Sequence, residues 1–241
     1  MATFPRLLLA ALIAPLAFAQ VSEKPADLIL PIVGSTRGQS NANFKTEMQM
    51  TNTSGSVASG WLIYRPQGLV LRYEIPPRAT ISFADVVASL GGSGIGSLDV
   101  LVDRGTPPTI VARAYDDQPS GTTGVTVPAI ASSAILIRGD SGALIAPRDP
   151  ARYRFNAGVR SLGSGATLEL VVRNAAGIEK TSRVISYEAD ESDLMSGAEL
   201  AGVTLEADDS IHVVIAAGSA IVFATTVDNQ TNDSSIQMLR K

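Results

Sequence analysis

Short runs in which hydrophobic and polar residues alternate follow one another along most of the chain. Residues 44–50 (Phe-Lys-Thr-Glu-Met-Gln-Met) alternate with a period of two and stop at the turn-forming residues 52–55. Residues 57–64 and 69–75 form two more runs, each of which ends at a turn that contains proline. A β-strand with one buried and one solvent-exposed face requires this alternation. We therefore predict a series of short antiparallel strands.

The strand pattern continues at residues 97–102 and 109–115. Only residues 83–90 have the character of a helix, and they provide about two turns before the stop signal Gly91-Gly92. Turn signals recur roughly every ten residues, which is typical of an all-β sandwich rather than of βαβ units.

The whole pattern occurs twice. Residues 44–68 align with residues 153–177 at a constant offset of 109, so that Trp61 matches Leu170. Residues 97–102 match residues 210–215 at an offset of 113. The small change in offset places insertions in loops, where they cost least.

We interpret the repeat as two tandem antiparallel β-sandwich domains of the immunoglobulin-like type. The first domain is assigned to residues 28–132 and the second, which repeats it, to residues 133–241. The alternative is a single larger sandwich whose strands share a common alternation.

The first 19 residues have the pattern of a cleaved secretory signal peptide. Arg6 precedes an apolar run at residues 7–16, and Ala17-Phe18-Ala19 forms an A-x-A cleavage site before Gln20. The apolar run is short for a membrane span. An uncleaved anchor is the alternative. We expect an exported protein, periplasmic or extracellular, that has no membrane span after signal cleavage.

Composition removes several chemistries from consideration. The chain has no cysteine and one histidine, which excludes disulfides, thiol catalysis, Cys-ligated zinc and paired-His metal sites. A formal net charge of −4 argues against a nucleic-acid partner. Acidic residues collect in the second half, and one segment carries four of them: Glu188, Asp190, Glu191 and Asp193.

The segment Gly139-Asp140-Ser141-Gly142 matches the nucleophile motif of chymotrypsin-like proteases. That mechanism needs a His base upstream of the serine, and the one histidine, His212, lies 71 residues downstream. Residues 211, 213 and 215 are apolar, so we expect His212 to lie on the opposite, solvent-facing side of its strand with Val214. Arg138-Gly139-Asp140 is also the integrin-recognition tripeptide, although turns favour the same residues.

Acidic turns follow a strand in each copy and are the candidate metal ligands. Asp116, Asp117, Asp228 and Asp233 could supply carboxylate oxygens to Ca²⁺, although no EF-hand spacing is present. Asp and Asn also begin turns by hydrogen bonding to their own backbone, with no metal. We assign no catalytic residues and no cofactor.

Trp61, Tyr64 and Tyr73 are the only aromatic group in the first copy that resembles a sugar platform. Because Trp61 and Ile63 alternate with Tyr64, we expect Trp61 in the core. A carbohydrate platform is the alternative.

At the repeated segments the chain resembles exported bacterial proteins of uncharacterised function that are built of tandem immunoglobulin-like or fibronectin-like β-sandwich domains. The residues that carry the resemblance are 51–56, 75–77, 83–90 and 227–231. The resemblance covers most of residues 28–241. It implies the fold and an exported location, and it implies no catalytic residues.

We therefore expect a non-enzymatic exported protein with a binding or structural role at the cell surface or outside the cell. Its partner would be an envelope protein or a surface glycan. A periplasmic pilus-type chaperone, which donates an edge strand to its client, is one alternative. A carbohydrate-binding module is another.

Overall fold

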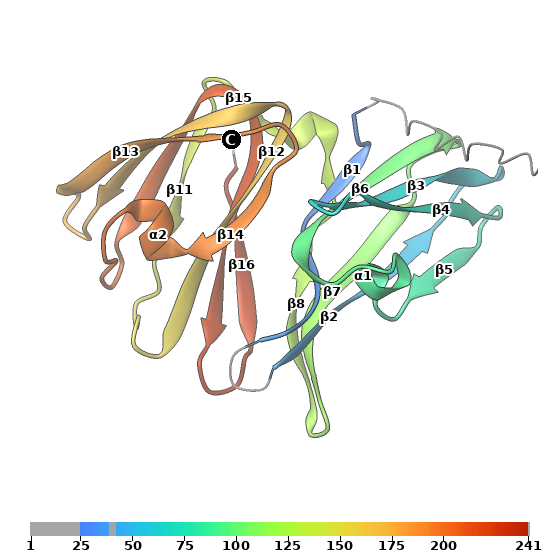
Figure 1. Ribbon diagram of the computed structural model, residues 1–241, viewed down its shortest axis with the longest axis horizontal. Helices are drawn as coiled ribbons and strands as arrows, with labels where there is room; N and C mark the ends of the chain where they lie inside the picture. Colours follow the sequence, from blue (N-terminus) through green and yellow to red (C-terminus); the bar gives the residue numbers. More distant parts are fainter. Residues whose placement is uncertain (1–24, 39–41, 241) are drawn as a thin grey trace, which may run out of the picture.

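The structure, a computed structural model, describes residues 25–38 and 42–240 (Figure 1). The predicted signal peptide at residues 1–19 lies outside the described residues. The described chain is mostly antiparallel β-structure, arranged as two sandwiches side by side. The prediction of an all-β protein built from antiparallel sandwiches is confirmed.

The first half of the chain forms one sandwich of two layers. One layer has the strand order β4-β3-β6-β1 and the other the order β5-β2-β7-β8; β1 pairs first with β6 and then with β2, so it joins the layers, and β9 adds to its first part. The elements are β1 (Leu28–Arg37), β2 (Asn43–Thr51), β3 (Ala58–Arg65), β4 (Leu69–Ile75), β5 (Thr80–Phe83), α1 (Val86–Ser89), β6 (Gly94–Arg104), β7 (Thr109–Gln118), β8 (Gly121–Val127) and β9 (Ile130–Ala131).

The second half is organised around two long strands that run through both layers. The first part of β12 pairs with β14 and with the last part of β15, whereas its last part pairs with β13 and with the first part of β15. The elements are η2 (Ser132–Ala134), β10 (Leu136–Ile137), β11 (Ser141–Ile145), β12 (Tyr153–Arg173), β13 (Glu179–Tyr187), β14 (Ser192–Ser196), α2 (Gly197–Ala201), β15 (Ser210–Asp228) and β16 (Ser234–Met238).

The two halves share one pattern of strand pairing. The contacts β2·β7, β3·β6 and β3·β4 of the first half correspond to the contacts of β12 with β15 and β13 in the second. In this nested order the second strand lies between the fifth and the seventh, whereas in an immunoglobulin constant domain the second strand lies between the first and the fifth.

A short helix lies at the same point of each half. In the first half the predicted helix at 83–90 is the four-residue α1, which Asp85 caps by accepting a hydrogen bond from the Ala88 N–H. In the second half α2 begins at a capping box formed by Ser196 and Glu199.

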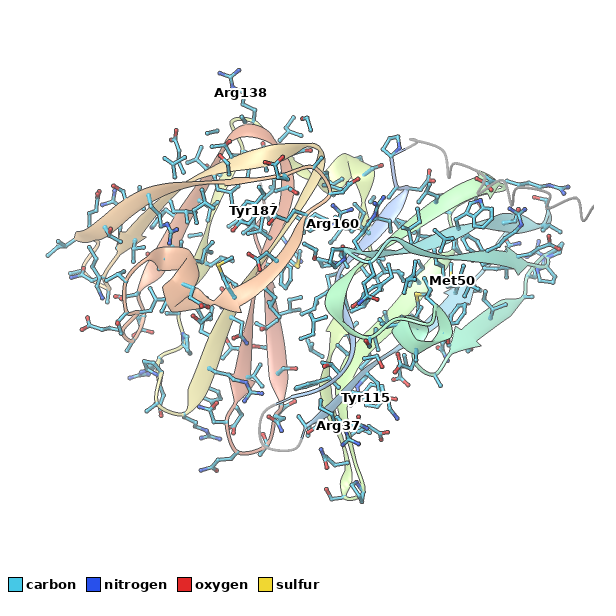
Figure 2. All side chains as sticks on the ribbon, viewed as in Figure 1. Arg37, Met50, Tyr115, Arg138, Arg160 and Tyr187 are labelled. Atoms are coloured by element: carbon cyan, nitrogen blue, oxygen red, sulfur yellow. The ribbon has the colours of Figure 1, made fainter. Side chains whose placement is uncertain are left out.

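Each half has its own hydrophobic core. One cluster of buried residues is drawn from positions 30–127 and the other from positions 136–239. Met50 and Tyr187 mark the two cores in Figure 2. Neither helix of the described part is long and apolar enough to cross a membrane.

The expected core position of Trp61 is wrong. Leu62 and Tyr64 are fully buried in the first core, and Trp61 lies on the outer face of β3, where the Arg72 guanidinium stacks over its ring at 5.3 Å. In the second half Leu170 is in the core. The structures therefore align Leu62 with Leu170, an offset of 108 rather than 109, and a slip of one residue exchanges the faces of a strand.

Tyr187 contributes a buried hydroxyl that has no hydrogen-bond partner within the described residues. Burial, and after it the negative charges of Asp193 and Glu191, raises the pKa of Tyr187 to about 12. The Tyr73 hydroxyl, by contrast, donates to the Leu101 carbonyl at 3.0 Å. The two buried tyrosines can therefore be compared directly, since one hydroxyl has a hydrogen-bond partner and the other has none within the described residues.

We expect Tyr187→Phe to raise the free energy of unfolding by about 1 kcal/mol at neutral pH, because it removes an unsatisfied buried group. Tyr73→Phe should lower the free energy of unfolding by about 1 kcal/mol. Because the pKa of Tyr187 is raised from 10 to about 12 by folding, the free energy of unfolding of the wild type should fall as the pH rises from 10 towards 12, and Tyr187→Phe should remove this fall. Urea unfolding of the three proteins at neutral and alkaline pH measures both effects. A destabilising Tyr187→Phe would contradict this account.

Candidate functional site at the junction of the two sandwiches

The first part of β12 and the last part of β15 are buried on both faces. Ala157 and Val159 point into the second core, together with Val222 and Ala224. The alternate positions face the first sandwich, and they are Arg154, Asn156, Gly158 and Arg160 on β12 and Ile221, Phe223, Thr225 and Val227 on β15. This outer face of the second sandwich is the docking face.

One end of the docking face is fixed by a buried ion pair. The Arg160 guanidinium is fully buried, and its Nη2 donates to both carboxylate oxygens of Asp99 on β6, at 3.0 and 2.9 Å. Its Nη1 also pairs with Asp190 at 3.2 Å. Arg65 donates to Asp99 at 3.2 Å from the first sandwich. Figure 2 shows Arg160 between the two halves.

The other end of the docking face is fixed by an amide that joins two charged groups. Asn232 donates from Nδ2 to the buried Asp116 at 3.1 Å and accepts from Nη2 of Arg154 at 2.8 Å. The other oxygen of Asp116 accepts from the Asn43 N–H at 2.6 Å and from Gln118 at 2.8 Å. The carboxylate therefore links the two sandwiches.

Close packing joins these two ends. The Phe223 ring is almost fully buried and lies directly over Gly158, where a Cβ atom would be 2.1 Å from a ring carbon. Only glycine permits this approach. Phe223 shares a small hollow with Ile32 and Ile95, so the ring reaches the first sandwich.

A cavity of about 340 Å³ lies beside this contact, between the two sandwiches. Its volume is at the lower end of the range for ligand pockets, and domain junctions are a common place for such pockets. The lining is mainly apolar, and it includes Ile32, Phe44, Ile95 and Val125 from the first half and Leu194 and Met195 from the second.

Three charged side chains line the cavity. Lys45 pairs with Asp117 at 2.7 Å, and this hydrogen bond raises the pKa of Lys45. Glu199 accepts from the Ser196 N–H and hydroxyl, which hold the pKa of Glu199 below its ordinary value. Arg154 donates only to the amide oxygens of Asn229 and Asn232 and forms no ion pair with any described residue.

Burial holds the pKa of Arg154 below its ordinary value, and the negative charges of Asp116 and Asp228 act in the opposite direction. The cavity is thus an apolar space with one cation at its edge that has no direct counter-ion. Such a space can hold a small molecule, and an anionic group would be favoured next to Arg154.

A second hollow of about 880 Å³ lies on the other side of Arg160. Its lining includes Ile63, Val70 and Ile137, together with Arg65, Asp99, Arg160 and Asp190. These four charged groups pair with one another, so the hollow has no uncompensated charge to select a ligand.

The four candidate calcium ligands were expected in turns, but Asp116 and Asp117 lie in the last part of β7 and Asp228 ends β15, so that Asp233 alone lies in a loop. Nitrogen donors engage the first three. Asp116 joins the sandwiches and Asp117 pairs with Lys45. Asp228 accepts from the Gln230 N–H, from Arg152 and from the Thr231 N–H, which lower its pKa. Asp233 is exposed. The described residues contain no group of three or more His, Cys, Asp or Glu side chains that could hold a metal ion.

The expected outward position of His212 is confirmed, since Ile211, Val213 and Ile215 are in the core. His212 shares a 3.2 Å hydrogen bond with Ser210. Ser141 pairs with Val214, so it is diagonal to His212 on the adjacent strand, but no hydrogen bond joins them.

The Arg-Gly-Asp segment forms the exposed turn between β10 and β11. The Asp140 carboxylate accepts from the Ile137 N–H at 2.8 Å. The Arg138 side chain points away from the molecule in Figure 2.

Sequence reasoning missed Asp99, Arg154 and Arg160. One signal was available, because residues 220–224 (Ala-Ile-Val-Phe-Ala) are an unbroken apolar run. A strand with only one buried face alternates, whereas an unbroken apolar run is typical of a strand that is buried on both faces.

A scan against models of protein families gave no match, and a search of curated proteins gave no relative.

We expect Arg160→Met or Asp99→Asn alone to lower the free energy of unfolding by up to about 3–5 kcal/mol, because each breaks the buried pair and leaves the remaining charge with a more exposed partner only, Arg65 for Asp99 and Asp190 for Arg160. The double variant Asp99→Leu/Arg160→Met should recover a large part of this loss, since it buries no charge. Glu179→Gln is the matched control, because it removes the exposed pair with Arg173 and should cost less than about 1 kcal/mol. Urea unfolding measures all four. Equal effects of the buried and exposed pairs would refute the role given to Arg160.

Proposed function

We propose that this chain is a non-enzymatic exported binding protein of the periplasm or cell surface, whose two sandwich domains act as one unit and hold a small ligand at their junction. The observation that carries the proposal is the apolar cavity between the halves. It is formed by residues from both sandwiches, and the polar contact Asp116–Asn232–Arg154 reaches its edge through Arg154.

The chemistry of the lining supports binding rather than catalysis. The residues that line the cavity include no histidine or cysteine. The one carboxylate beside a lining serine is Glu199, which accepts from the Ser196 hydroxyl at 2.9 Å as part of the capping box, and these hydrogen bonds lower its pKa and make it a weak base. Nucleophilic catalysis by serine needs an effective general base within hydrogen-bond distance.

The resemblance to exported tandem-sandwich proteins and the leader at residues 1–19 support the proposed location. When the full chain is expressed in a bacterium, we expect a mature protein that begins at Gln20, which N-terminal sequencing would show. Recovery of the chain with Met1 intact in the membrane fraction would favour the uncleaved anchor.

The binding proposal is tested with a neutral apolar fluorophore, N-phenyl-1-naphthylamine, and the mature chain. We expect saturable binding at one site, because the apolar cavity removes the probe from water. Val125→Phe fills the cavity and should reduce the affinity at least about tenfold, a change of about 1.4 kcal/mol. The matched control Val111→Phe adds the same ring at a position that is 58% exposed and should leave binding unchanged. Equal binding by both variants, or no binding by the wild type, would overturn the proposal.

A carbohydrate-binding role is the second candidate, and the position of Trp61 favours it. The indole is on the outer face of β3, partly exposed, beside Arg72 and its ion-pair partner Asp103. If the wild type binds a glycan on an array through this surface, we expect Trp61→Ala to abolish the binding. Val125→Phe, which changes the cavity, should bind the same glycan as well as the wild type does. Binding that survives Trp61→Ala would remove this candidate. No observation favours the pilus-type chaperone, since the arginines between the halves, Arg65 and Arg160, are paired with Asp99 and Asp190.

A further inference from the structure

We propose that the ligand of the interdomain cavity is an amphipathic anion, with a slender apolar body in the cavity and one carboxylate or similar group bound by Arg154. This inference rests on the proposed function, because it names the chemical class that the same cavity takes.

The apolar body follows from the lining. Side chains from seven strands, namely β1, β2, β6, β7, β8, β14 and β15, supply aliphatic or aromatic surface to the cavity. Met195 and Leu194 close it from the second sandwich, and the flexible methionine side chain can adapt to the shape of a chain-like ligand.

The anionic group follows from a difference between the two copies of the repeat. Lys45 and Arg154 occupy equivalent positions, 109 residues apart, and both line the cavity. In the first copy the partner of Lys45 is the carboxylate of Asp117, at 2.7 Å. In the second copy the equivalent partner of Arg154 is the neutral amide of Asn229, at 3.3 Å. The second copy therefore has the cation of this pair without its anion.

Neighbouring carboxylates do not take the place of that anion. Asp116 accepts from Asn43, Gln118 and Asn232, and Asp228 accepts from Arg152 and two backbone N–H groups. Both attract Arg154 without a direct hydrogen bond to it.

Arg154 keeps donors for a ligand. A guanidinium has five N–H donors, and the two hydrogen bonds of Arg154 go to Asn229 and Asn232. The Nε of Arg154 is partly accessible and has no partner among the described residues. A guanidinium with open donors at the edge of an apolar space binds a carboxylate with charge-assisted hydrogen bonds, which are stronger in such surroundings than in water.

The test compares octanoate with 1-octanol, which have the same chain length and differ in charge, by calorimetric titration of the mature chain. We expect octanoate to bind at least about tenfold more tightly than the alcohol. Arg154→Gln and Asn229→Asp should each reduce octanoate to the affinity of the alcohol and leave the alcohol unchanged. Asn229→Asp is the sharper variant, because it keeps Arg154 and supplies the counter-ion that the first copy has.

Two control variants separate the local effect from general charge and from folding. Gln230→Glu adds the same charge at the next residue and should keep the preference for octanoate. Asp117→Asn removes the counter-ion of Lys45 and should also keep it. Thermal melting of each variant verifies that it is folded before titration.

The outcomes distinguish this inference from the function on which it rests. Equal affinity of the wild type for octanoate and octanol overturns the anionic class, while binding of the neutral fluorophore preserves the proposed function. A preference for octanoate that persists in Arg154→Gln and Asn229→Asp overturns the role of Arg154. Failure of octanoate, octanol and fluorophore alike overturns both proposals.

Discussion

The buried ion pair between Arg160 and Asp99 is the constraint on which the relation of the two sandwiches depends. A guanidinium that is completely removed from water is costly unless carboxylates meet it with good geometry. The second sandwich carries the cation, and the first supplies Asp99. In the docked molecule each of these two buried charges therefore depends on a partner from the other half. The same requirement fixes the orientation of the docking face, and with it the position of the cavity and of Arg154 at the far end of the same strand.

Much of the fold could be predicted from the sequence, because one-sided burial leaves a clear period of two. Where a strand has one wet face, as around His212, the pattern identified the inward residues correctly. Around Trp61 it did not, because Trp61 and Ile63 are as apolar as the inward Leu62 and Tyr64. The alternation of Trp61 and Ile63 with Tyr64 was therefore compatible with either face, and the face chosen for Trp61 was the wrong one. Alignment of the two repeats in the structure gives the correct face, because the offset is 109 residues in the first aligned strand and 108 in the next.

The candidate site could not be predicted from the sequence, for a different reason. Arg160 and Asp99 are 61 residues apart, and Asp116 and Asn232 are 116 apart, so no local pattern joins them. The acidic turns were noticed because they recur, yet equivalent positions perform different tasks. Asp116 accepts a hydrogen bond from Asn232 of the other sandwich. Asp228 accepts hydrogen bonds from the backbone of the turn that follows it and from Arg152, all within its own sandwich. A repeat predicts a shared fold, but the partners of a side chain depend on which copy lies next to it.

The docking face also determines whether the contact between the two repeats of one molecule can form again between separate molecules. The ion pair Asp99–Arg160 joins non-equivalent positions of the two repeats, and contacts of this kind continue into filaments when every unit carries both complementary surfaces. In this molecule the docking face is present only in the second repeat, and the surface that receives it is present only in the first. The first-half counterparts of Arg154, Asn156, Gly158 and Arg160 are Lys45, Glu47, Gln49 and Thr51, a polar row without the glycine or the second arginine. The counterpart of Asp99 in the second half is His212, which has no carboxylate to offer. Divergence of the copies has thus made the contact self-terminating, so that one molecule does not add to the next by the contact that joins its own halves.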